Sequence, residues 1–110
     1  MEYTIPQIHE MFILCRDSIE KVKVLEIIPL LTTDLLFCVH RAFEDNKVLV
    51  VSEFTTGLSL CREEVNIKTI VMRAQGILYE HSINEIREVI SQHRVINSLN
   101  GPVCLQRIKI

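Results

Sequence analysis

The residues best able to do chemistry in this chain are Cys38, His40 and Glu53. A thiol, an imidazole and a carboxylate can form a nucleophile, its base and an orienting group, because a neighbouring imidazole stabilises the thiolate. If residues 35–54 form a β-hairpin that turns at Asp45-Asn46, Glu53 lies opposite Cys38 and diagonal to His40. A shift of one residue in the pairing would separate them. The alternative interpretation is a solvated His–Glu pair on the outer face of a sheet.

Motifs for metals and cofactors are missing from the sequence. The four histidines lie far apart, and none has the His-X-X-X-His or Glu-X-X-His spacing that places two ligands on one helical face. The three glycines are isolated, so the chain has no glycine-rich phosphate-binding motif. The sequence therefore predicts neither a cofactor nor a metal ion, and only Cys38, His40 and Glu53 remain as weak catalytic candidates.

The composition is typical of one folded domain covering residues 1–110, with 48% apolar residues and a net charge of −2. This charge disfavours binding to nucleic acid, although a local basic surplus occurs late in the chain at Arg87, Arg94, Arg107 and Lys109. No apolar run approaches the roughly 20 residues that cross a bilayer. The N-terminus carries no targeting pattern, so we expect a cytoplasmic location without membrane contact.

Four cysteines are spread almost evenly along the chain, at positions 15, 38, 61 and 104. None forms a Cys-X-X-Cys pair, and a disulfide framework would require a secreted context that the N-terminus does not indicate. Each also lies among apolar neighbours, where a reduced thiol behaves as a small hydrophobic group. We therefore expect four free and mostly buried thiols.

The first element expected from the pattern is a helix over residues 5–20. Thr4 and Gln7 have the spacing of a capping box, and apolar residues recur at helical spacing at Ile8, Met11, Phe12, Cys15 and Ile19. The segment 22–28 could extend this helix or form a short strand. Pro29 ends it in either case.

A three-stranded β-meander is expected over residues 35–61. Apolar and β-branched runs flank the Asp45-Asn46 turn, and Gly57 supplies a second turn before a short third strand. The two-residue turn sets a register that places four apolar side chains on the buried face, namely Phe37, Phe43, Val48 and Phe54.

Two helices are expected next, over residues 67–80 and 83–97. Asn66 can cap the first, and Ser82 with Glu85 forms a capping box for the second. Gly76 interrupts the first helix at a cost of about 1 kcal/mol relative to alanine, which a closely packed neighbouring helix would explain. Residues 103–110 form a candidate final strand, and its last four residues alternate charged and apolar side chains.

These elements predict an α+β fold. Because the strands cluster and their connections are short, we expect a three- to five-stranded, mainly antiparallel sheet, packed on one face by about three helices (5–20, 67–80 and 83–97).

For function, the leading hypothesis is a non-enzymatic protein-interaction module that forms a homo-oligomer, most simply a homodimer. The aliphatic composition exceeds what a soluble monomer needs, and the two edges of a small sheet tend to pair or to be blocked. One alternative is a nucleic-acid-associated accessory protein of a bacterium, phage or mobile element, whose binding would weaken steeply with salt. The other is a small Cys/His enzyme whose activity alkylation would abolish.

Overall fold

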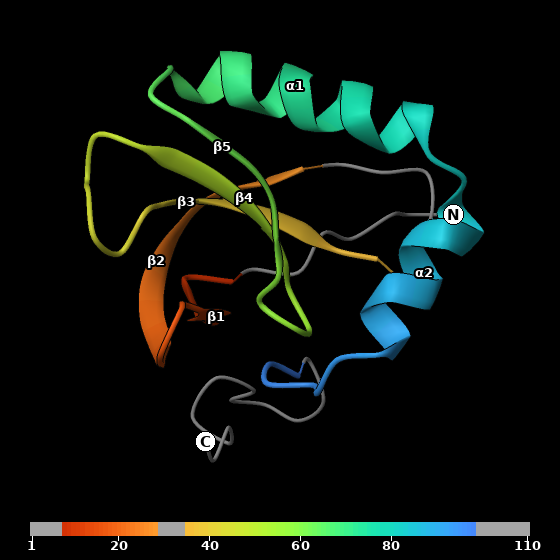
Figure 1. Ribbon diagram of the computed structural model, residues 1–110. Helices are drawn as coiled ribbons and strands as arrows, with labels where there is room; N and C mark the ends of the chain where they lie inside the picture. Colours follow the sequence, from red (N-terminus) through yellow and green to blue (C-terminus); the bar gives the residue numbers. More distant parts are fainter. Residues whose placement is uncertain (1–7, 29–34, 99–110) are drawn as a thin grey trace, which may run out of the picture.

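A computed structural model describes residues 8–28 and 35–98, which form a five-stranded antiparallel sheet and two helices (Figure 1). The strands lie side by side in chain order, so the sheet is a simple meander. The elements in order are β1 (Glu10–Leu14), β2 (Ile19–Ile28), β3 (Phe37–Arg41), β4 (Leu49–Glu53), β5 (Ser59–Glu63), α1 (Ile67–Glu80) and α2 (Ile83–Ser91). The predicted α+β class and the antiparallel meander over residues 35–61 are confirmed.

The predicted helix over residues 5–20 is wrong, because its described part, from residue 8 on, forms β1, a tight turn and the start of β2. Met11 and Ile13 enter the core with the two-residue period of a strand and are 0% and 6% exposed. The turn is closed by the Cys15 N–H, which donates to the Ser18 carbonyl over 2.8 Å. The spacing of the apolar residues is compatible with the period of a helix and with that of a strand, and pairing with β2 selects the strand. The predicted cap of this helix lies outside the described residues.

The ambiguous segment 22–28 belongs to β2, so it is a strand. A bulge between Val24 and Glu26 interrupts the pairing of β2 with β3 and bends the strand. The β1–β2 hairpin then covers one face of β3 and β4, where Met11 clusters with Cys38 and Phe54. All five residues of β4 are buried as a result. The alternative interpretation, a solvated His–Glu pair on the outer face of the sheet, is therefore also wrong.

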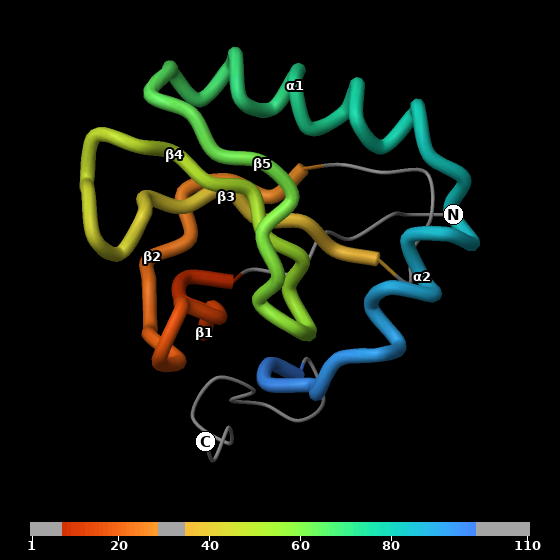
Figure 2. Tube along the Cα trace, viewed as in Figure 1, coloured from red at the N-terminus to blue at the C-terminus, as the bar shows by residue number. Residues whose placement is uncertain are grey.

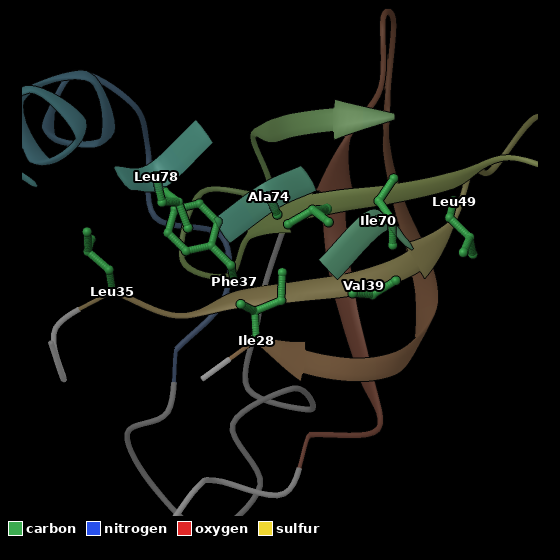
Figure 3. Packing of buried hydrophobic residues seen from close by; sticks show 9 residues of the cluster. Ile28, Leu35, Phe37, Val39, Leu49, Ile70, Ala74 and Leu78 are labelled. Carbon is green, nitrogen blue, oxygen red and sulfur yellow. The ribbon is translucent and has the colours of Figure 1, made fainter. Parts of the chain in front are cut away.

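Helix α1 covers the opposite face of the sheet, with the predicted bounds of residues 67–80. Its start is fixed as expected, because the Asn66 side chain accepts a hydrogen bond from the Thr69 N–H over 2.8 Å. Three residues one turn apart, Ile70, Ala74 and Leu78, are buried against the strands (Figure 3). Their partners in this core cluster come from β2, β3 and β4 and the residues before β3: Ile28, Leu35, Phe37, Val39, Leu49 and Val51.

Helix α2 begins at the predicted capping box of Ser82 and Glu85, but it ends at Ser91 and not at residue 97. None of its residues is fully buried. The chain after α2 turns back toward β1 (Figure 2) and becomes buried at Ile96 and Asn97. The candidate strand 103–110 lies outside the described residues. Within the described ranges neither helix is long and apolar enough to cross a membrane.

The predicted register of the β3–β4 hairpin is wrong by one residue. Phe37 pairs with Glu53, not with Phe54, and the connection is longer than the expected two-residue turn at Asp45-Asn46. Phe43 therefore lies outside the core and is 57% exposed. Because both faces of this hairpin are covered, apolar residues occur on both, and apolar pairing could not select the register.

The outer edge of β1 is closed by the side chain of Asn97. The Asn97 Oδ1 accepts a hydrogen bond from the Phe12 N–H at 2.9 Å, and the Asn97 Nδ2 donates to the Phe12 carbonyl at 2.8 Å. The same Nδ2 donates to the Phe54 carbonyl at 2.7 Å. Beside it, the Leu14 N–H donates to the Gly57 carbonyl at 3.2 Å. One buried amide thus replaces the backbone of a neighbouring strand and joins β1 to the end of β4.

Gly57 occupies the turn between β4 and β5, where only glycine fits. Its φ of +71° lies in the left-handed region, which other residues adopt at a cost. A Cβ there would lie 2.8 Å from the Ile13 Cα and 2.9 Å from the Phe12 carbonyl oxygen. The expected turn at Gly57 is therefore present, and its closeness to β1 adds a second requirement for glycine.

Candidate functional site

The hairpin places the three candidate residues differently from the sequence prediction. Cys38 lies opposite Ser52, and Glu53 lies opposite Phe37. Because neighbouring residues of a strand face opposite sides, Glu53 lies on the face that α1 covers, whereas Cys38 and His40 lie on the face covered by β1. The structure brings His40 together with Ser52, which the sequence did not single out.

The Cys38 thiol is completely buried among apolar side chains. Burial raises the pKa of Cys38 to about 12, and the negative charge of Glu53 contributes to the same shift. The reactive form of a cysteine is the thiolate, which Cys38 does not form near neutral pH. Burial is also the main factor that raises the pKa of Cys15 and of Cys61. All three are free thiols, as expected, but only Cys38 is buried, whereas Cys15 and Cys61 are partly exposed. Cys104 lies outside the described residues.

The Glu53 carboxylate anchors the turn after β4. It accepts hydrogen bonds from the backbone N–H of Thr55 at 2.9 Å and from that of Thr56 at 3.0 Å. The two threonine hydroxyls also donate to it, at 2.8 and 2.7 Å. A buried carboxylate that is hydrogen-bonded on both oxygens is a structural group. Glu53 therefore holds the β4–β5 turn, and both ring nitrogens of His40 have other partners.

His40 and Ser52 form a buried hydrogen-bonded pair between β3 and β4. The His40 Nδ1 lies 2.9 Å from the Arg41 carbonyl, which can only accept, so Nδ1 carries the proton. Nε2 is then the acceptor for the Ser52 hydroxyl, 2.8 Å away. Burial lowers the pKa of His40, while the hydrogen bond to the Arg41 carbonyl and the charge of Glu44 oppose this shift. His40 is thus a neutral imidazole.

The His40–Ser52 pair lines a cavity of about 410 Å³ whose walls are both apolar, with Ile13, Leu14, Phe43 and Val50, and polar, with Arg16, Asp17, Ser18, Glu44, Ser59 and Arg62. A serine that donates to an imidazole is one part of a nucleophilic site. An oxyanion would also need free N–H donors nearby. In β3 and β4, residues 38 to 41 pair with residues 49 to 52, so the backbone of the pair is part of the sheet. The arrangement satisfies two buried polar groups and fixes the strand register.

The pH dependence of stability should reveal His40. Because its folded pKa is lowered, the unfolded chain takes up a proton near pH 6.5 that the folded chain does not. Stability from this group is complete above about pH 6.5 and is lost as pH falls below it. Urea unfolding at pH 7.5 and 5.5 should show this loss, and His40→Gln should reduce it. The exposed-histidine control His93→Gln should leave it unchanged, and an equal loss in both variants would contradict the assignment.

A second hollow lies between α2 and the beginning of β5. Its volume is about 360 Å³, and most of its lining is apolar: Phe37, Leu58, Leu60, Ile86, Val89 and Ile90. Ile86 and Ile90 already pack against the core cluster beneath α1. The groove is therefore bounded by side chains that attach α2 to the rest of the domain.

A third hollow lies on the face of α1 that points away from the sheet. Its volume is about 500 Å³, and it is lined by Thr69, Met72, Arg73, Gly76, Ile77 and Glu80. Most of these residues recur at three- and four-residue spacing, so they follow one side of the helix. Met72 is 63% exposed, and Tyr79, about two turns further along the helix, is 82% exposed. We call Met72, Arg73, Gly76, Ile77, Tyr79 and Glu80 the outer face of α1.

No three His, Cys, Asp or Glu side chains in residues 8–28 and 35–98 lie close enough to hold a metal ion. The sequence analysis did not identify the outer face of α1. A signal for it was available, because Met72 and Tyr79 are large side chains on the side of the helix away from its apolar stripe. No protein-family model, curated protein or solved structure matches this chain.

Proposed function

We propose that this chain is a non-enzymatic protein-interaction module that works as a homodimer. The observation that carries the proposal is the outer face of α1, where two large side chains are exposed beside a hollow. Large exposed side chains on one face of an otherwise well-packed helix are typical of a surface that a partner covers.

Gly76 lies in the middle of this face and supports the same proposal. Glycine within a helix costs about 1 kcal/mol relative to alanine. A Cβ at position 76 would meet nothing within 4 Å, so packing within the described chain gives no reason for this choice. The closely packed helix that Gly76 predicts is not among the described residues, and a second copy of the chain is the simplest source.

The candidate catalytic residues support a role without catalysis. The Cys38 thiol is buried and protonated, Glu53 anchors a turn, and His40 is bonded to Ser52. We place the protein in the cytoplasm, where free thiols are the rule. The alternative of nucleic-acid binding depended on the basic residues late in the chain, and Arg107 and Lys109 lie outside the described residues. No feature of the described surface favours this alternative.

Sedimentation of the native chain at tens of micromolar tests the proposal. We expect twice the chain mass of 12.7 kDa, falling toward the monomer on dilution. Gly76→Gln should give a monomer with an unchanged fold, because a side chain there has space in the single chain but blocks close approach. The control Glu88→Gln on α2 should remain dimeric. A mass of 12.7 kDa at every concentration would overturn the proposal.

A further inference from the structure

We propose that two copies pair through antiparallel α1 helices about a two-fold axis that passes between Gly76 and Ile77. This inference rests on the proposed homodimer and specifies its geometry. The two helices then run in opposite directions past each other. A residue that lies a given number of positions before the axis in one copy faces the residue that lies the same number of positions after the axis in the second copy. The outer face of α1 is self-complementary under this rule.

The glycine at the centre sets the distance between the helices. Gly76 lies on the side of α1 opposite the buried residues Ala74 and Leu78, so it faces directly outward. In the antiparallel pair, Gly76 of one copy lies close to Gly76 of the other, and the backbones can approach closely.

Opposite charges meet on both sides of the axis. Arg73 of one copy lies opposite Glu80 of the second copy, and the two-fold axis repeats this pair. Arg73 is held at the surface by its ion pair with Glu63, with half of its side chain exposed. A guanidinium has five N–H groups, so it can bind a second carboxylate. Glu80 is exposed, and within the described part of the chain it has no ion-pair partner.

The two large exposed side chains also meet. Met72 of one copy and Tyr79 of the second copy are two residues, about 3 Å along the helix, away from lying opposite each other, which long side chains can span. Both lie on the side of the contact away from Arg73 and Glu80. A thioether next to an aromatic ring is a favourable contact. Both side chains, which are exposed in the single chain, would be covered by the same pairing.

A parallel pair would place the same residues badly. Under a two-fold axis parallel to the helices, every residue faces its own copy, so Arg73 would lie against Arg73 and Glu80 against Glu80. Like charges at this distance repel. The charge pattern therefore selects the antiparallel arrangement.

Charge reversal tests the geometry by sedimentation of purified chains. Arg73→Glu alone should raise the dissociation constant of the homodimer at least about tenfold, because both inter-copy pairs become repulsive. Glu80→Arg alone should do the same. An equimolar mixture of these two variants should form a heterodimer, because the introduced glutamate then lies opposite the introduced arginine. In that heterodimer the remaining native Arg73 and Glu80 also lie opposite each other. The double variant Arg73→Glu/Glu80→Arg should again form a homodimer.

The outcomes separate the two proposals. A native dimer that both single variants retain at full strength overturns the α1 geometry and leaves the homodimer intact. A native chain that stays monomeric overturns both. Arg73→Glu also breaks the bond to Glu63 within the chain, which weakens the fold in the double variant as well. The loss of this bond is the same in the single and in the double variant, so a dimer that recovers in the double variant must be restored by contacts between the copies. Circular dichroism checks that each variant is folded. Should Arg73→Glu fail to fold, Glu80→Arg alone decides: an undiminished dimer overturns the geometry.

Discussion

Replacing Asn97 with alanine should lower the free energy of unfolding by about 3 kcal/mol or more, the largest effect expected of a single polar residue here. The substitution leaves the Phe12 N–H and the carbonyls of Phe12 and Phe54 without their partner. Each unsatisfied buried group costs about 1–3 kcal/mol. Urea unfolding at pH 7.5 would measure the loss.

A matched control separates the role of Asn97 from the general effect of losing an amide. Asn46 lies exposed in the β3–β4 loop, and Asn46→Ala should change the unfolding free energy by less than about 0.5 kcal/mol. Should Asn97→Ala behave like Asn46→Ala, the side chain of Asn97 does not close the edge of β1.

Gly57→Ala should cost about 3 kcal/mol, the second large effect. The left-handed backbone costs an L-residue about 1–2 kcal/mol. The new Cβ would also lie 2.8 Å from the Ile13 Cα, a backbone atom that cannot move without displacing β1. Thermal and urea unfolding of the variant would measure the combined loss.

Gly76→Ala is the control, and its effect on the single chain should have the opposite sign. Gly76 has ordinary helical geometry and open space around it, so alanine should stabilise α1 by up to about 1 kcal/mol. The comparison is made at a concentration where both chains are monomeric. A loss at Gly57 no larger than that of an ordinary surface substitution would mean that the β4–β5 turn can move away from β1.

The starts of both helices were predictable from the sequence, because the capping signals that set them are local. The cap at Asn66 and the capping box at Ser82 depend on residues within one turn of each other, and both occur as expected. The end of α2 was not predictable in this way. The chain leaves the helix after Ser91 because Ile96 and Asn97 are buried against the end of β4 and against β1, far away in sequence.

The N-terminal part of the fold depends on contacts that the local pattern does not contain. Apolar residues around Met11 fit a helix and a strand alike, and β1 is a strand because β2 and the side chain of Asn97 satisfy its backbone. The same limit applies to the candidate site. The residue types at Cys38, His40 and Glu53 suggested catalysis, but in the observed register His40 forms a hydrogen bond with Ser52.

The amide that closes β1 also has a consequence for the order in which the chain is made. Asn97 follows Phe12 by 85 residues, so the outer edge of β1 stays uncovered while all five strands and both helices are synthesised. An uncovered strand edge can pair with another nascent chain. We therefore expect ribosome-bound fragments that stop before Asn97 to aggregate more readily than fragments a few residues longer, once both have left the exit tunnel.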